Sequence, residues 1–187
     1  MYEQIRNGAP PKSLGTSFNI SHQLSNTQNE FFNLWTDADG VHNIIYNAVE
    51  QQWQAKVDFS THAASSPLNV ASNNKIVNVW QVGQTFYSNY LTDNGWSEAS
   101  AITQLAGAYY PALNANQDIF ALTWRENIAD GQLIKALRTT DLSWTDENIK
   151  TLSQRLPVDS NIQVSHFNQG FKTIWVAPNL NDASFPR

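Results

Sequence analysis

The sequence predicts an all-β protein made of about four antiparallel units of roughly 45 residues, arranged as a β-propeller. Two observations support this prediction. Aromatic residues recur at a nearly constant spacing, and the segments around them have the alternating pattern of short strands. A length of 187 residues suits one domain, or one array of small units that share a core.

Three sequence tracks repeat along the chain. The segments FFNLW, IVNVW, FALTW and QVSHF step by 45, 44 and 43 residues and end at Trp35, Trp80, Trp124 and Phe167. A second track steps by 43 and 48 and consists of Trp53, Trp96 and Trp144. A third track, a short apolar-Asn phrase, begins at Phe18, Leu68, Leu113 and Val158. The chain therefore divides into a single repeat domain, 1–187, with units of about 18–67, 68–112, 113–157 and 158–187.

Each unit is predicted to contain three or four short antiparallel strands. KIVNVWQVG and TFYSNYLTD are rich in β-branched and aromatic residues and are separated by a glycine, which is typical of a hairpin. The same pattern surrounds TDADG, NIADG and NQG, where glycine supplies the positive φ of a tight turn. Further strands carry the second tryptophan and the phrase SSPLNVAS. The stretch WTDENIKTLSQRL has a helical turn as its alternative.

The ends of the chain predict how the repeat closes. The fourth unit stops after FKTIWVAP, and the N-terminal stretch YEQIRNGAPPKSLGTSFNIS aligns with the end of another unit. Residues 1–17 are therefore expected to complete the last unit, which removes the free strand edges that closed all-β folds avoid. A larger propeller shared by two chains, as a homo-oligomer, is the alternative.

Composition excludes several classes of partner. The chain is 41% hydrophobic and only 14% charged, with a net charge of -5 and 11 scattered Lys and Arg residues. A nucleic-acid binder would need a basic surface, so no nucleic-acid partner is expected. With no cysteine there is no disulfide or thiol nucleophile. No run approaches 18 apolar residues, so no membrane insertion is expected.

The compartment is left open by the sequence. The first 30 residues lack the basic and then apolar pattern of a secretory signal. We expect a soluble chain, and an extracellular or secreted role remains one alternative.

The unit VNVWQVGQTFYSNYLTDNGWSEAS resembles the blades of β-propeller lectins, both the fungal and bacterial fucose-binding type and the bacterial seven-bladed type. Its TDNGWS also resembles the aspartate box of sialidase-type propellers. The resemblance extends in rhythm over nearly the whole chain. It implies several equivalent sugar sites between adjacent blades, each with the sugar stacked on an aromatic ring.

Aromatic and amide side chains are the candidate ligand-binding residues, because aromatic rings stack on sugar rings and amides meet sugar hydroxyls. The candidates that follow polar turns are Trp53 with Gln52, Trp96 with Asn94 and Ser97, and Trp144. Asn33 and Asn78 stand where the fucose-binding pattern has an arginine, and Tyr46 and Tyr90 belong to the neighbouring strands. Trp35, Trp80 and Trp124 lie within apolar strands and are expected to be core.

No catalytic residues, metal site or cofactor are predicted. Asp37 and Asp39 in TDADG are the best-spaced carboxylates, but aspartate at a turn hydrogen-bonds its own backbone. The four histidines lack zinc-ligand spacing, and no nucleotide-binding glycine motif is present.

The sequence thus favours a lectin with several weak sites for neutral glycans on glycoproteins or cell surfaces. A protein-interaction scaffold is the main alternative, because a fold does not determine a function. A sialidase-like glycoside hydrolase is the third hypothesis, although it would need an arginine cluster for which the sequence shows no repeated placement.

Overall fold

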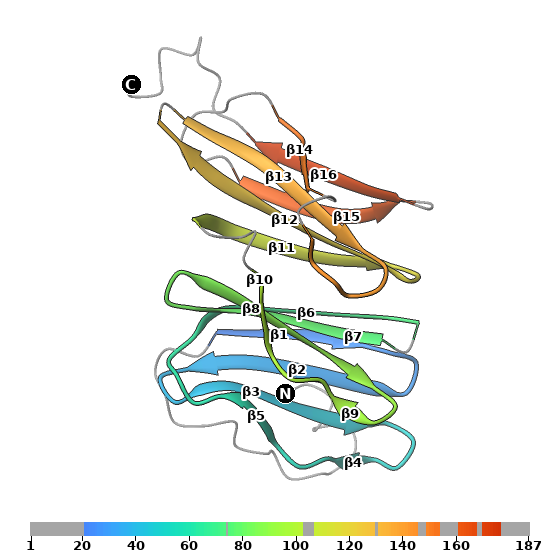
Figure 1. The fold of residues 1–187 in the computed structure, drawn as a ribbon. Coiled ribbons are helices and arrows are strands. Elements are labelled where there is room, and N and C mark those ends of the chain that lie inside the picture. The colour runs from blue at the N-terminus through green and yellow to red at the C-terminus, as the bar shows by residue number, and fades with distance from the viewer. Residues whose placement is uncertain are drawn as a thin grey trace.

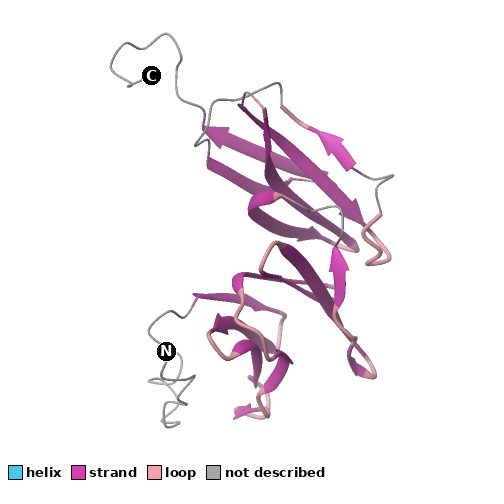
Figure 2. Cartoon of the chain, turned by 60° about the vertical axis from the view of Figure 1, so that its left-hand side comes forward, coloured by secondary structure: helices cyan, strands magenta, loops and turns pink. Residues whose placement is uncertain are grey.

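The computed structural model describes residues 21–73, 75–102, 107–129, 131–145, 149–153, 161–167 and 170–176. These residues form strands joined by turns and loops, with no helix among them (Figure 2). Every strand pair is antiparallel. The predicted all-β antiparallel class is therefore confirmed. The helical alternative for WTDENIKTLSQRL is wrong for its central residues, because Ile149–Thr151 is a strand.

The strands form four sheets that follow one another along the chain (Figure 1). The first contains β1 (Ser21–Asn26), β2 (Glu30–Asp37), β3 (Gly40–Asn47), β4 (Gln52–Trp53) and β5 (Val57–Ser60). The second contains β6 (Ser65–Ser72), β7 (Lys75–Val82), β8 (Thr85–Thr92), β9 (Gly95–Trp96) and β10 (Ser100–Ile102). The third contains β11 (Ala108–Asn116), β12 (Ile119–Ile128), β13 (Gly131–Thr139) and β14 (Ile149–Thr151). The fourth contains β15 (Asn161–Phe167) and β16 (Gly170–Val176).

Each of the first three sheets is a meander in which sequential strands pair. The orders are β1-β2-β3-β4, β6-β7-β8 with β9 and β10 on β8, and β11-β12-β13-β14. Short turns connect the long strands, as the glycine-containing hairpin motifs predict. The sheets start slightly before the predicted units, since β6 begins at Ser65 and β11 at Ala108.

The pairing of the first two long strands repeats at the predicted period. Leu24 lies opposite Asn33 in the first sheet, Asn69 opposite Asn78 in the second, and Leu113 opposite Leu122 in the third. The positions Asn33, Asn78 and Leu122 are therefore equivalent, at steps of 45 and 44 residues. Most of the predicted phrase at Phe18 lies outside the described residues, and β1 takes that place in the first sheet.

The predicted phase of the fourth unit differs from the strand order of the last sheet. Trp35, Trp80 and Trp124 are each the sixth residue of their strand, and in the last sheet that position belongs to Trp175 rather than to Phe167. β15 lies beside β11, as β11 lies beside β6 and β6 beside β1. It is therefore a first strand. The spacing alone did not fix the phase, because β15 and β16 are both short and partly apolar and each carries an aromatic residue near its end. Either strand could therefore be aligned with the strands that contain Trp35, Trp80 and Trp124.

Apolar layers hold successive sheets face to face. Phe32, Leu34, Val41 and Ile45 of the first sheet pack against Ile76 and Trp80 of the second. Val77, Val79 and Phe86 on the other face of the second sheet pack against Phe120, Leu122, Trp124 and Leu137 of the third. Alternate residues of a strand point to opposite faces, so a sheet inside the stack needs apolar residues on both. This explains the nearly continuous apolar runs of β7 and β12.

The tryptophans of the first track belong to the core, as predicted. Trp35, Trp80 and Trp124 are each 1% exposed. Trp80 faces the first sheet and Trp124 faces the second, so each of these two packs against the sheet that precedes it in the chain.

The first and last sheets lie at opposite ends of the stack (Figure 1). The strands predicted to complete the last unit, residues 1–17, lie outside the described residues.

Candidate functional site

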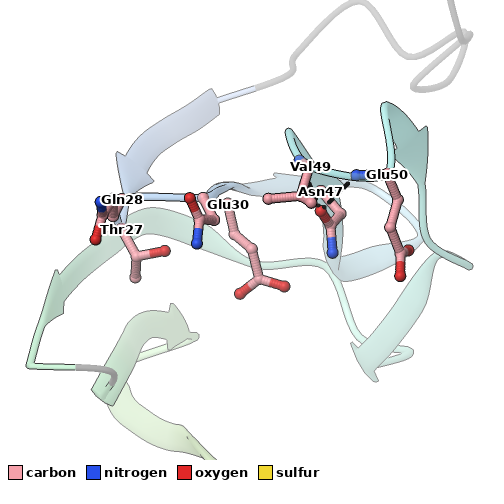
Figure 3. Close-up of a pocket in the computed structure, with 7 residues that line it drawn as sticks. Thr27, Gln28, Glu30, Asn47, Val49 and Glu50 are labelled. Carbon is pink, nitrogen blue, oxygen red and sulfur yellow. Dashed lines mark hydrogen bonds between the residues drawn. The ribbon is translucent and has the colours of Figure 1, made fainter.

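A polar hollow of about 420 Å³ lies at one end of the first sheet (Figure 3). It is lined by residues 27–29 between β1 and β2, by Glu30 at the start of β2, by Asn47 at the end of β3, and by Val49 and Glu50 in the turn that follows. Asn47 Oδ1 accepts hydrogen bonds from the backbone N–H groups of Val49 and Glu50, at 2.9 and 3.0 Å. The amide and carboxylate side chains of this hollow could bind a polar ligand. No aromatic ring is among its lining residues, so the hollow offers no surface on which a sugar could stack.

Trp53 and Trp96 occupy equivalent positions. Each belongs to a two-residue strand that pairs with the end of the third strand of its sheet, Trp53 with Tyr46 and Trp96 with Leu91. Both indoles are partly buried. Trp96 meets the ring of Phe59 edge-on at 4.9 Å and packs on the core between the first two sheets. The ring centroids of Trp53 and Tyr46 are 5.0 Å apart. These two tryptophans therefore contribute to packing.

Trp144 also contributes to packing. It lies in the loop after β13, and its Nε1 donates a hydrogen bond to Ser88 Oγ on β8 at 3.1 Å, which joins the third sheet to the second. Asp141 holds this loop by accepting from the side chains of Ser143 and Thr139. These hydrogen bonds, with Ser143 the strongest contributor, lower the pKa of Asp141 to about 2.

The polar residues predicted beside the tryptophans divide into two groups. Ser97 is occupied within its own sheet, since Tyr90 N–H donates to its Oγ and Ser97 N–H donates to the Tyr90 carbonyl. Tyr90 packs on the core between the second and third sheets. Gln52 and Asn94 are exposed and remain accessible to a ligand. Gln52 lies next to Trp53 in the first sheet, and Asn94 lies two residues before Trp96 in the second.

Asn78 belongs to a buried row of asparagines between the first and second sheets. Asn69, Asn78 and Asn89 lie side by side on one face of the second sheet and are at most 6% exposed. Asn78 Nδ2 donates to Asn89 Oδ1 at 3.0 Å, and Asn69 Nδ2 donates to the carbonyl of Phe32 at 3.2 Å. Asn78 is therefore structural in this arrangement.

The matching row of the third sheet consists of leucines, namely Leu113, Leu122 and Leu137. The asparagine row is thus particular to one interface and is not a repeated ligand site. Asn33 lies on the face of the first sheet that points away from the second sheet. Its backbone carbonyl accepts a hydrogen bond from Asn43 Nδ2 at 3.1 Å. Tyr46 is only 8% exposed. Neither the asparagines nor Tyr46 join the tryptophans in a solvent-facing cluster.

The TDADG turn is held as the sequence predicts. Asp37 Oδ1 accepts from the backbone N–H groups of Asp39 and Gly40, at 2.8 and 3.1 Å. It also lies 3.0 Å from Nε2 of buried His42, whose Nδ1 lies 2.6 Å from Asp58. A ring protonated at both nitrogens is the form that donates to both carboxylates. Lys56 completes the cluster at 2.7 Å from Asp58.

These contacts lower the pKa of both aspartates. For Asp37, burial raises the pKa, but the hydrogen bonds from His42 and from the backbone outweigh it. For Asp58, the hydrogen bonds from Lys56 and His42 lower the pKa. A carboxylate whose folded-state pKa lies below its unfolded value stabilises the fold above that unfolded value, and the contribution is lost as the pH falls through the folded-state pKa.

Asp37→Asn is therefore expected to lower the free energy of unfolding by about 1.5–3 kcal/mol at pH 7, the usual worth of a hydrogen bond to a charged group. The difference from the wild type should narrow as the pH falls from 3.8, the ordinary pKa of aspartate, through the lower folded-state pKa of Asp37, where the wild-type carboxylate also becomes neutral. Urea unfolding between pH 2.5 and 7 measures this. Asp39→Asn, at an exposed position of the same turn, is the control. An equal cost of Asp37→Asn at both extremes of pH would contradict the prediction.

A cluster that the sequence reasoning missed lies on the third sheet. Tyr109 and Tyr110 are adjacent at the start of β11 and are 48% and 69% exposed. A β-bulge follows Tyr109, and Tyr110 has a left-handed φ of 50°. The Arg125 guanidinium lies against the Tyr110 ring, 3.9 Å from its centroid. The arrangement combines an accessible aromatic surface with a cation.

Arg125 is itself 3% exposed and is held by amides. Its Nη1 donates to Gln132 Oε1 at 3.3 Å, and Gln132 Nε2 donates to Asn127 Oδ1 at 2.8 Å. Its Nε has no hydrogen-bond partner, and no carboxylate pairs with it in the part of the chain that the structure describes. We name Tyr109, Tyr110, Arg125, Asn127 and Gln132 the Tyr-Arg cluster.

The Tyr-Arg cluster departs from the repeat, and that departure is the signal that could have identified it. Arg125 pairs with Tyr109 near the start of the first strand of its sheet. Thr36 and Gln81 pair with Ser21 and Ser65 in the same way, so they occupy the equivalent positions in the first and second sheets. A sequence search for residues shared by all units passes over an arginine and a tyrosine pair that occur in one unit alone.

No protein-family model matches the chain, and no curated protein matches it significantly.

The described parts of the chain contain neither a cluster of metal ligands nor a membrane-spanning helix. No group of three or more histidine, aspartate or glutamate side chains there could hold a metal ion. Those residues also include no helix of the length and apolarity needed to cross a membrane.

Proposed function

We propose that this protein binds saccharides through the Tyr-Arg cluster. The observation that carries the proposal is the pair of consecutive tyrosines, 48% and 69% exposed, beside buried polar groups. Aromatic side chains usually bury most of their surface, so two adjacent exposed rings mark a binding surface. Tyrosine rings stack on the apolar faces of pyranoses, and the guanidinium and amides below supply directional hydrogen-bond donors and acceptors.

The arrangement of the sheets supports a β-propeller as the scaffold. In a propeller, meander sheets are the blades and their first strands line an axis. Here the first strands β1, β6, β11 and β15 lie beside one another in sequence, and each sheet continues away from them. The first and last sheets lie at opposite ends of the stack, so the described residues do not close the ring (Figure 1). We propose that residues 1–17 complete the last of four blades and close the ring. A larger ring formed by two copies of the chain is the alternative.

Additional weak sites would increase binding to glycans displayed on glycoproteins or cell surfaces. Gln52 and Asn94 are exposed next to Trp53 and near Trp96, and the polar hollow of the first sheet offers further hydrogen-bonding groups (Figure 3). A site of millimolar affinity is worth only about -4 kcal/mol, but several sites together bind a dense surface much more tightly. The proposal places the main affinity at the Tyr-Arg cluster.

A glycan array read together with red-cell agglutination tests this function. Wild-type protein is expected to bind, and Tyr110→Ala is expected to weaken binding at least about tenfold, because the loss of about 1.4 kcal/mol of contact with the aromatic ring corresponds to a tenfold loss of affinity. Leu24→Ala is the control, since Leu24 is a 59% exposed apolar residue on another sheet. Binding that survives Tyr110→Ala unchanged would place the site elsewhere.

A protein-interaction scaffold is the second candidate, and one observation favours it. The Tyr-Arg cluster occurs once among the described units, whereas a multivalent lectin repeats its site in each blade. An exposed tyrosine pair with an arginine is also the composition of a protein-binding hot spot. Absence of binding across the whole array would favour this function over the lectin.

A further inference from the structure

Arg125 carries a positive charge that the described residues leave uncompensated. Its side chain is 3% exposed, yet its described partners are the neutral amide of Gln132 and the ring of Tyr110. Glu126, the next residue, points to the other face of the strand and pairs with Lys135 at 2.6 Å. Buried charges are normally paired, because removing a charge from water is costly.

The free part of the guanidinium has a defined shape. Nη1 is occupied by Gln132, and Nε has no hydrogen-bond partner among the described residues. Nε–H and Nη2–H lie along one edge of the planar group and point in parallel. This edge matches the two oxygens of a carboxylate, which arginine binds in a bidentate manner.

Tyr110 is the solvent-exposed residue that contacts the guanidinium. The ring that lies against the guanidinium belongs to a residue that is 69% exposed, the highest value among the described aromatic residues, so little other packing retains it. Its backbone is in the left-handed region, at φ 50°, which is unfavourable for a non-glycine residue.

We propose that the Tyr-Arg cluster prefers saccharides that bear a carboxylate, such as hexuronates, and that Arg125 binds the carboxylate. This inference rests on the proposed saccharide function and refines it, because the composition alone favours neutral glycans. The ring of the sugar contacts the tyrosines, while its carboxylate pairs with Nε and Nη2 of Arg125.

The test compares sugars that differ only at C6. Affinities for methyl galacturonoside and methyl galactoside are measured by titration with the full chain, for the wild type, Arg125→Gln and Arg138→Gln. Arg138 is an exposed arginine of the same sheet, so its replacement changes the net charge equally and leaves the cluster intact. Wild type and Arg138→Gln are expected to bind the acid at least about tenfold more tightly than the neutral sugar. Arg125→Gln should bind the two within about twofold of each other.

The outcomes separate the two proposals. Equal affinity of the wild type for both sugars, or a preference that survives Arg125→Gln, overturns the carboxylate assignment and leaves saccharide binding in place. Equal affinity for galactose 6-sulfate and galacturonate also overturns it, in favour of a general anion site. If the wild type binds none of these sugars, the saccharide function itself is wrong and the assignment falls with it. Circular dichroism of Arg125→Gln checks that the variant is folded. Arg125→Lys is the second variant, because it keeps the positive charge but lacks the two parallel N–H groups of the guanidinium.

Discussion

Trp80→Ala is expected to lower the free energy of unfolding by about 3–5 kcal/mol, the usual cost of removing a large buried aromatic side chain. Trp80 is 1% exposed and lies between the first two sheets, where it stacks with Phe59 at 5.9 Å and with Tyr87 at 6.3 Å. Leu34 and Val41 of the first sheet complete this layer. The variant therefore loses the contact between two sheets as well as its own burial. Chemical unfolding followed by far-UV circular dichroism measures the change.

Trp53→Ala is the matched control for Trp80. Trp53 is the same residue type and lies on the first sheet, but it is only partly buried and belongs to a two-residue strand. Its replacement should cost about 1–2 kcal/mol, within the ordinary range for single substitutions. If the two variants lose equal stability, the contact between the first and second sheets is not the dominant packing that we describe.

Gly40→Ala is expected to have the second large effect, with a loss of about 3 kcal/mol, the upper part of the cost of overpacking. Gly40 has φ 143°, and a Cβ placed there would overlap the backbone carbonyl oxygen of Ser60 on β5. The clash cannot be relieved by turning a side chain, so β5 must move away from β3. Asp58 and its contact with His42 are displaced with it. Hydrogen exchange of the β5 amides should accelerate more than that of the β7 amides.

Gly83→Ala separates this clash from the general cost of positive φ. Gly83 has φ 60°, but no heavy atom lies within 4 Å of a Cβ built there. Its replacement should cost only about 1–2 kcal/mol, the penalty of a left-handed conformation. A Gly40→Ala variant no less stable than Gly83→Ala would show that β5 is not pressed against the β2–β3 turn.

Both proposed functions, lectin and scaffold, depend on the Tyr-Arg cluster rather than on the repeated tryptophans. The repeated tryptophans contribute to packing between or within sheets, as the hydrogen bond of Trp144 to Ser88 and the contact of Trp96 with Phe59 indicate. The accessible aromatic surface is instead the tyrosine pair of one sheet. Tests of function should therefore begin with Tyr110 and Arg125 rather than with the tryptophans.

Much of the architecture followed from local sequence. The alternation of apolar residues and the Asp-Gly turns predicted the strands and hairpins, since strand periodicity and positive φ are properties of a few neighbouring residues. The burial of Trp80 and Trp124 followed from their apolar flanks. The backbone hydrogen bonds of Asp37 followed from its place in a turn.

The tertiary structure alone decided which residues meet. Asn78 looked like a ligand-facing amide, but its register places it between two sheets, where only a neighbouring asparagine accepts its hydrogen bond. Tyr110 reaches Arg125 because a bulge in β11 rotates one residue out of the strand alternation. Strand register, bulges and the facing of sheets depend on contacts between residues far apart in the chain. For this reason the repeat could be read from the sequence, whereas the Tyr-Arg cluster could not.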